Sequence, residues 1–271
     1  MGSLSNYAEN ELLDHVFNAA YTPAATIYLA LATADPTDAA TGASMNEVAN
    51  SGSYARKAIS FGAAASRRVT SSGTVTFDQA TGSWGTVTHW AIVDSATHGA
   101  GNVLAHGAFT NSKAVVSGNT PSVASGEVYV EFSAGYISDY LSNKLLDLMF
   151  RNTAYSKPAT YIALTTATIA DDDTGSTITE PGSGAYARKQ VNINGGATPT
   201  WKIATGGLVE NNEDVDFPQA TGSWGTIVAM AIVDASSAGN LLFYDNGVTD
   251  QAVGTDDTAS FPASSLDIQM S

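Results

Sequence analysis

The chain has 271 residues, of which 44% are hydrophobic and 14% charged, and its formal net charge is −15 at pH 7. This acidic balance argues against a nucleic-acid partner, because phosphate binding needs clustered Lys and Arg. The chain has no cysteine, which excludes disulfides and thiolate metal sites. No apolar run approaches the roughly 20 residues of a membrane-spanning helix, so we expect no membrane insertion.

Residues 5–20 are predicted to form the first helix. Ser5 or Asn6 can cap its start, and its apolar side chains recur at helical spacing: Tyr7, Leu12, Leu13, Val16 and Phe17. The pattern returns at residues 137–151, where Leu145-Leu146-Asp147 repeats Leu12-Leu13-Asp14. We therefore expect one helix at the start of each of two related halves, laid on the face of a sheet.

A predicted strand and then a long polar loop follow each helix. The strands are expected at residues 28–31 and 161–164, and the loops cover residues 34–53 and 168–185. Each loop ends in Tyr-Ala-Arg-Lys, with Arg56 in the first copy and Arg188 in the second, and alternating apolar residues after it predict another strand. The repeated Arg-Lys pair is typical of the solvent face of an edge strand, or of a contact with an acidic patch on a partner.

The octapeptide Gln-Ala-Thr-Gly-Ser-Trp-Gly-Thr occupies residues 79–86 and recurs at 219–226, each time ahead of an Ala-Ile-Val-Asp ending. An identical match inside longer similar frames identifies the chain as a tandem duplication. Residues 84–93 and 224–233 are apolar or small on both faces, which predicts a central strand covered on both sides. We interpret Trp84 and Trp224 as core side chains beside a tight turn rather than as a ligand site.

Further strands are predicted at residues 103–109, 128–132, 241–244 and 266–270, and the segment 194–213, with Trp201, predicts an extra hairpin in the second copy. One helix followed by seven or eight short strands favours a mainly β fold: two tandem homologous antiparallel β-sandwich domains, jelly-roll-like, each with one N-terminal α-helix. We place the domains at residues 1–133 and 134–271, each with its own core, and leave the strand order open. The joint Ser133-Ala134-Gly135 is too short to let the domains separate.

No recognisable catalytic motif is present in the sequence. The four histidines, His15, His89, His98 and His106, all lie in the first copy, and the second copy places Leu148 and Ala229 opposite two of them. Gly-x-Ser-x-Gly and His-Glu-x-x-His are absent. We therefore predict a protein that is not an enzyme, with no catalytic, cofactor-binding or metal-binding residues and no cofactor.

Two sets of carboxylates leave alternatives open. Asp171, Asp172 and Asp173 offer oxygen ligands to a hard cation such as calcium, but they lack the ligand spacing of an EF-hand, so a solvated loop is the favoured interpretation. Asp94 and Asp234 end the two central strands. Each either pairs with the arginine of its own copy or caps the next turn.

Several motifs together make each half resemble a family of small virion proteins of tailed bacteriophages and prophages, of the tail-fibre or head-decoration type. The residues that carry the resemblance are Ser5-Asn6-Tyr7-Ala8-Glu9-Asn10, Tyr28-Leu29-Ala30-Leu31, Tyr54-Ala55-Arg56, Thr81-Gly82-Ser83-Trp84-Gly85 and Gly239-Asn240-Leu241-Leu242-Phe243-Tyr244. The resemblance implies a structural component of the virion, brings no catalytic residues, and does not decide where on the particle it sits.

The leading hypothesis is a non-enzymatic capsid decoration (cement) protein, assembled in the host cytoplasm and bound to the outside of the head. Its partners would be the major capsid protein or other virion proteins, with self-association also open. The alternative is a tail fibre or host-recognition module whose long loops contact a receptor or a host surface glycan. A carbohydrate-active enzyme would rest only on an analogy of fold, which says little about function.

Overall fold

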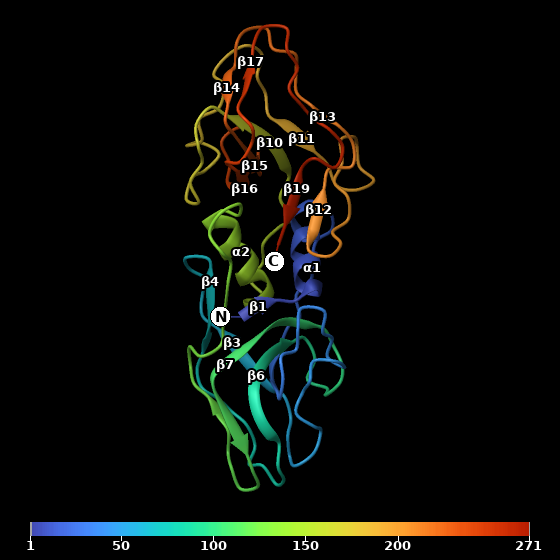
Figure 1. The fold of residues 1–271 in the computed structure, drawn as a ribbon, viewed down its shortest axis with the longest axis vertical. Coiled ribbons are helices and arrows are strands. Elements are labelled where there is room, and N and C mark those ends of the chain that lie inside the picture. Colours follow the sequence, from blue (N-terminus) through green and yellow to red (C-terminus); the bar gives the residue numbers. More distant parts are fainter. Residues whose placement is uncertain (1, 271) are drawn as a thin grey trace.

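The computed structural model describes residues 2–270, in which two helices, α1 (Asn6–Phe17) and α2 (Asp139–Arg151), lie between two bodies of β-strands (Figure 1). The strands of the first half are β1 (Gly2–Leu4), β2 (Ile27–Ala32), β3 (Lys57–Phe61), β4 (Arg68–Ser72), β5 (Val75–Thr76), β6 (Gly85–Val93), β7 (Val103–Val115), β8 (Ser122–Val123) and β9 (Tyr129–Glu131). Those of the second half are β10 (Thr160–Thr165), β11 (Lys189–Val191), β12 (Leu208–Glu210), β13 (Val215–Asp216), β14 (Gly225–Ile227), β15 (Ala229–Val233), β16 (Leu241–Asp245), β17 (Gln251–Val253), β18 (Ser260–Phe261) and β19 (Asp267–Gln269). The prediction of a mainly β fold with a leading helix in each half is confirmed.

Equivalent serines start the two helices. The Ser5 hydroxyl accepts a hydrogen bond from the Ala8 N–H (3.2 Å), and the Ser138 hydroxyl accepts one from the Leu141 N–H (3.1 Å), which satisfies one of the free amides of each first turn. Ser138 also donates to the carbonyl of Leu241 in β16 (2.6 Å). The caps therefore both begin the helices and attach them to a strand.

Seven strands of the first half close into a barrel in the order β1-β7-β6-β2-β3-β4-β9, and β5 and β8 pair as a separate two-stranded sheet. Its neighbours are antiparallel except for a single parallel pairing of Gly2 with Val130 between β1 and β9. β6 lies between β2 and β7, as its doubly apolar sequence predicts. Closure leaves this sheet without an exposed edge strand. A sandwich of two separate sheets was expected here, and the structure shows a closed barrel instead.

The second half carries the same central arrangement in a more open form. β15 lies between β10 and β16 in a four-stranded antiparallel sheet, and the remaining strands pair two by two. The run predicted as one strand over 224–233 is broken at Val228 into β14 and β15, and the Val228 N–H donates to the Thr165 carbonyl (2.9 Å).

The long polar loops fold over the outer faces of the two sheets. In the first half Ala40 and Met45 are buried against Ala30, Ala91 and Val93 of the central strands. In the second half Ile169 and Ile178 cover the same face in the same way. The loops thereby supply the second apolar layer that a sheet buried on both faces requires.

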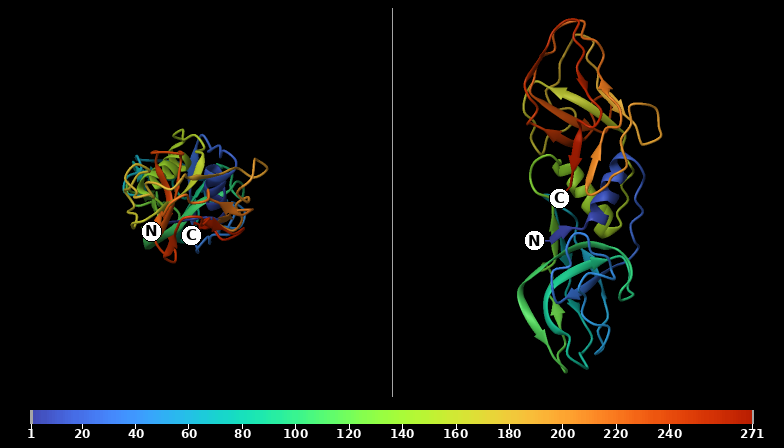
Figure 2. Two further views of the ribbon diagram at one scale, coloured as in Figure 1. Left: turned by 90° about the horizontal axis from the view of Figure 1, so that it is seen from above. Right: turned by 45° about the vertical axis from the view of Figure 1, so that its right-hand side comes forward.

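The largest hydrophobic core is continuous across both halves. α1 contacts β1 and β7 of its own half and β12 of the other, and α2 contacts β16 of its own half and β3 and β4 of the other. This differs from the expectation of a separate core in each half. The views in Figures 1 and 2 show the consequence: an elongated body whose two ends lie on either side of a shared helical layer, with both chain termini near its middle.

The segment that lengthens the second copy belongs to this shared core. Trp201 is fully buried, and its indole N–H donates to the Thr160 hydroxyl (2.8 Å). Asn192 and Asn211 form isolated bridges with Thr200 and Trp201. The segment predicted as a hairpin therefore packs, through Trp201 and Ala204, into the core that the two halves share. No helix within residues 2–270 has the length and hydropathy that crossing a membrane requires.

Candidate functional site

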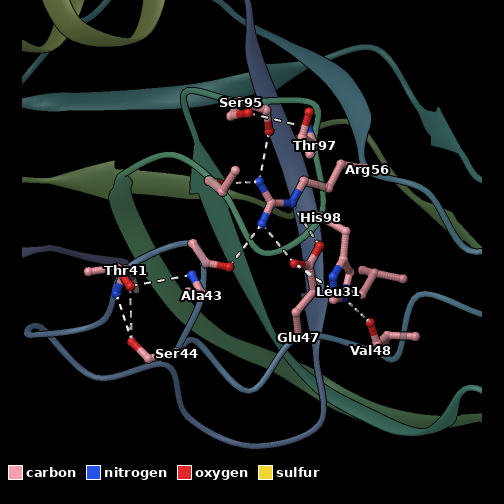
Figure 3. A network of polar contacts seen from close by, with 12 residues as sticks. Leu31, Thr41, Ala43, Ser44, Glu47, Val48, Arg56, Ser95, Thr97 and His98 are labelled. Atoms are coloured by element: carbon pink, nitrogen blue, oxygen red, sulfur yellow. Dashed lines mark hydrogen bonds and ion pairs between the residues drawn. The ribbon is translucent and has the colours of Figure 1, made fainter.

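The guanidinium of Arg56 lies at the centre of the most extensive polar network of the first half (Figure 3). Its Nε and Nη2 donate to the two carboxylate oxygens of Glu47 (2.8 and 2.7 Å). Nη1 donates to the carbonyls of Ser95 and Ala100 (both 2.8 Å), and Nη2 also reaches the carbonyl of Gly42 (3.2 Å). The side chains of Arg56 and Glu47 are 0% and 4% exposed, so the pair is buried and every guanidinium nitrogen has a partner.

The second half repeats this network. Arg188 donates through Nη2 to Glu180 (2.6 Å), through Nη1 to the carbonyls of Ala235 and Ala238 (2.8 and 2.7 Å), and through Nη2 to the carbonyl of Gly175 (2.6 Å). The interpretation of the arginines as the solvent face of an edge strand is therefore wrong. Each arginine links the long loop that covers its sheet to the turn after the central strand. A guanidinium can do this because its five planar N–H donors bind a carboxylate and several carbonyls at the same time.

A tyrosine joins each network to the repeated octapeptide. The Tyr54 hydroxyl donates to Glu47 (2.9 Å), and burial, followed by the Glu47 charge, raises the pKa of Tyr54. The ring of Tyr54 meets the Trp84 indole edge to face with centroids 5.3 Å apart. The indole N–H of Trp84 donates to the Gly52 carbonyl (2.8 Å). The interpretation of Trp84 as a core residue is confirmed, and Trp224 makes the equivalent bond to Gly184 (2.8 Å).

Asp94 and Asp234 cap the turns that follow the central strands. Asp94 accepts from the backbone N–H of Asn102 (2.7 Å) and from its side-chain amide (2.8 Å). Asp234 accepts the same two bonds from Asn240 (both 2.6 Å). Of the two roles that the sequence left open, capping is the one that the structure shows, and the arginines pair with Glu47 and Glu180 instead.

The four histidines lie in different surroundings and do not converge. His15 is buried and accepts the Tyr21 N–H at Nδ1 (3.0 Å). His89 lies within hydrogen-bonding distance of the Thr88 hydroxyl (2.8 Å), and His98 of the Val48 carbonyl (3.0 Å). His106 stands between two loop carboxylates, Asp35 (3.2 Å) and Asp38 (2.9 Å).

The three consecutive aspartates of the second half also separate. Asp171 accepts from the Tyr244 hydroxyl and from Arg67 of the first half, whereas Asp173 accepts from the Ala170 N–H (2.7 Å). Asp172 is exposed. Between Gly2 and Met270 no three His, Asp or Glu side chains gather as metal ligands would.

Polar side chains of each helix bind the backbone of the opposite half. In α1, Asp14 accepts the Ala204 N–H (2.9 Å) and Asn10 accepts the Gly207 N–H (2.9 Å). In α2, the equivalent residues Asp147 and Asn143 accept the amides of Ala64 (2.8 Å) and Arg67 (3.0 Å). Each helix is therefore joined to the opposite half by the same pair of hydrogen bonds. Sequence patterns did not reveal this reciprocal arrangement.

Two titratable groups are buried at this shared layer. Burial, together with the charge of Asp38, raises the pKa of Glu9 to about 7, and a Cβ added at Gly207 (φ +72°) would lie 2.7 Å from its carboxylate. Burial lowers the pKa of His15, and the charge of Lys157 lowers it further. The Nε2 of His15 is buried without a hydrogen-bond partner. Both shifts favour the uncharged forms of these side chains.

Two open grooves lie on the surface of the described residues. One, of about 470 Å³, lies in the second half and is lined by Leu164, Ile227, Gln251, Val253, Asp257 and Phe261. The other lies at the junction, where Phe61 meets Phe150. The Asp257 carboxylate in the first groove accepts the Gly254 N–H (2.7 Å), so this group stabilises the local turn.

Comparison with known proteins gives one family. No curated protein matches the chain. The family model described as "Podophage GP4 fiber I protein gp80" matches twice, over residues 3–131 and again over residues 136–269. The two matches cover each half in turn, which supports the tandem duplication seen in the octapeptides. The chain therefore belongs to this family of podophage fibre proteins, as a tandem repeat of its unit.

Proposed function

We propose that the chain is a non-enzymatic structural subunit of a podophage virion and serves in a fibre as a rigid connector. The observation that carries this proposal is the family match over both halves, taken with the continuous core that joins them into one elongated body. A shared core resists bending at the joint between the halves, because moving one half would expose apolar surface.

The chemistry of the polar networks supports a role without catalysis. The buried charges of Arg56 and Glu47 are saturated by hydrogen bonds, and both carboxylate oxygens of Asp94 are occupied by Asn102. Catalytic groups instead need a free nucleophile or base beside a pocket that admits substrate. The role of these networks is to hold the loops in place.

Attachment to the outside of the capsid is the second candidate. The similarity of the two halves favours it, because a chain with two related units can occupy two neighbouring equivalent sites on the capsid surface. The major capsid protein would then be the partner. A receptor-binding role of the loops at 34–53 and 168–185 gains less support, because both loops are fastened over a sheet.

Imaging of purified particles tests both candidates. Electron microscopy with an antibody against the chain should place the label on fibres, and label spread over the head would favour the decoration role. Mass spectrometry of the same particles supplies the control. Absence of the chain from intact virions would contradict both.

A further inference from the structure

We propose that the two ends of the molecule are equivalent docking surfaces, through which one chain binds two copies of the same virion protein. The surface at each end consists of the exposed residues of the repeated octapeptide, and we call the two surfaces the first tip (residues 79–86) and the second tip (residues 219–226). The proposal rests on the proposed function and specifies how the subunit attaches.

The tips lie at opposite extremes of the elongated body. They lead into β6 and β14: β14 lies near one end of the body, and β6 lies in the half that forms the other end (Figure 1). Because the core between them is continuous, the distance between the tips is set by the fold. A partner must therefore present its two sites at a matching spacing.

The fold explains most of the octapeptide but not all of it. Trp84 is buried, Gly85 has φ +81°, and the amide of Gln79 donates to the Gly118 carbonyl (3.0 Å). Thr81 and Thr86 are exposed. Their counterparts Thr221 and Thr226 are equally exposed, and the core gives no reason for their identity.

One of these threonines has been kept although its local partner changed. The Thr81 hydroxyl bonds the Ser53 hydroxyl (3.0 Å). In the second copy Ala185 stands in place of Ser53. Thr221, the equivalent of Thr81, therefore lacks this hydrogen bond and is nevertheless still a threonine. A contact outside the chain gives a reason to keep the hydroxyl.

The turn next to each tip is also exposed, and its sequence differs between the two copies. Residues 116–119 are Val-Ser-Gly-Asn, and the equivalent residues 254–257 are Gly-Thr-Asp-Asp, so the two turns differ in residue identity at every position. The backbone is nevertheless the same: the Ala80 N–H donates to the Asn119 carbonyl and the Ala220 N–H to the Asp257 carbonyl, both at 2.8 Å. The fold tolerates change here, while the octapeptide beside it stayed identical.

The chemistry of the tips points to an uncharged polar partner surface. The octapeptide has no ionisable side chain in a chain of net charge −15, and its exposed groups are hydroxyls and amides. A second copy of this chain is disfavoured as the partner, because two such acidic bodies repel each other. Since the tips face away from each other, two neighbouring proteins of one particle can engage both, whereas a flat host surface engages one.

Two weak contacts at a fixed spacing suffice for firm attachment. Once one tip is bound, the second binds at a high effective concentration if the spacing matches, and avidity then exceeds either single affinity by on the order of 100-fold or more. A small loop at each end can thus hold the subunit in place.

Binding of purified chain to particles of the parent phage assembled without it tests this proposal, with co-sedimentation as the readout. The first-tip variant carries Thr81→Arg and Thr86→Arg, the second-tip variant Thr221→Arg and Thr226→Arg, and a third variant all four. The matched control, Ser117→Arg with Thr255→Arg, alters exposed residues of the adjacent turns. Thermal melting of each variant verifies that it folds.

We expect each single-tip variant to bind roughly 100-fold more weakly than the original chain, the four-substitution variant to stay at background, and the control to bind normally. Raising the salt from low to high should change binding little, because the tips are uncharged. Normal binding by the four-substitution variant, or sensitivity to one tip only, would overturn the proposal. The proposal would also be overturned if the four-substitution variant lost self-association in sedimentation velocity, or lost binding to host cells, while it still bound particles. Failure of the original chain to bind particles at all would instead refute the proposed function.

Discussion

The indole of Trp201, in the second half, packs against the ring of Phe17 at the end of α1 in the first half, with the ring centroids 4.7 Å apart. Phe17 in turn lies 5.5 Å from the ring of Phe243. These side chains are buried. The contact makes the unfolding of each half depend on the other, because separating the halves exposes aromatic surface of both.

Trp201→Ala should destabilise the whole chain by about 3–5 kcal/mol, because it leaves a cavity at the shared core. Urea unfolding followed by circular dichroism measures the loss. Ile203→Ala, at a side chain that is 60% exposed, is the control and should change stability by less than about 0.5 kcal/mol. An unchanged urea midpoint for Trp201→Ala would contradict the shared core.

Trp84→Ala and Trp224→Ala should each cost about 3–5 kcal/mol, since each empties a core site and frees a glycine carbonyl. Because Trp84 and Trp224 make the same bond of 2.8 Å, we expect similar losses in the two halves. Differential scanning calorimetry compares them. Equal thermal stability of both variants and the original chain would show that the indoles are dispensable.

Glu47→Gln should cost about 3–5 kcal/mol, because it leaves the buried Arg56 guanidinium without its counter-charge. Glu180→Gln should cost less, since the Glu180 side chain is 19% exposed. Lys57→Met is the matched control: the Lys57–Asp78 pair is exposed at 28% and 60% and is worth at most about 1 kcal/mol. Chemical denaturation at neutral pH ranks the three, and a larger loss from Lys57→Met would refute the assignment.

Glu9→Gln should stabilise the protein at pH 8 and leave it unchanged at pH 4. Folding raises the pKa of Glu9 from 4.5 to about 7, so the protonated form favours the folded state below pH 4.5 and this advantage is lost as the pH rises through 7. The shift corresponds to at most about 3 kcal/mol. Urea midpoints of both proteins across this range should diverge as pH rises, and parallel curves would mean that Glu9 is not buried as a neutral acid.

His15→Leu should remove part of the loss of stability in acid. Burial lowers the pKa of His15 below 6.5, so its neutral form favours the folded state above pH 6.5 and stability falls as pH decreases below that value. Leu148 fills the equivalent buried position of the second half, which shows that leucine suits this place in the fold. Melting temperatures at pH 5 and pH 7.5 should differ less in the variant, and an equal difference would exclude His15 as the source.

Local patterns predicted the elements well. The spacing of Leu12 and Leu13 placed α1, and the two copies of the octapeptide placed β6 and β14, because periodicity and turn residues act over a few positions. The partners of Arg56 could not be predicted in this way. Glu47 and the carbonyl of Ala100 are brought to it by two separate loops. The sequence Tyr-Ala-Arg-Lys is the same whether its arginine is buried or exposed.

The sequence by itself determined that the chain is a duplication, mainly β, with a helix leading each half, because repeats and hydrophobic periodicity are written in neighbouring residues. Only the tertiary structure decided that the halves share a core, that Asp14 and Asp147 bind opposite halves, and that the octapeptides stand at opposite ends. These relationships join residues far apart in the chain, where burial of apolar surface and pairing of polar groups choose between arrangements that local patterns allow equally.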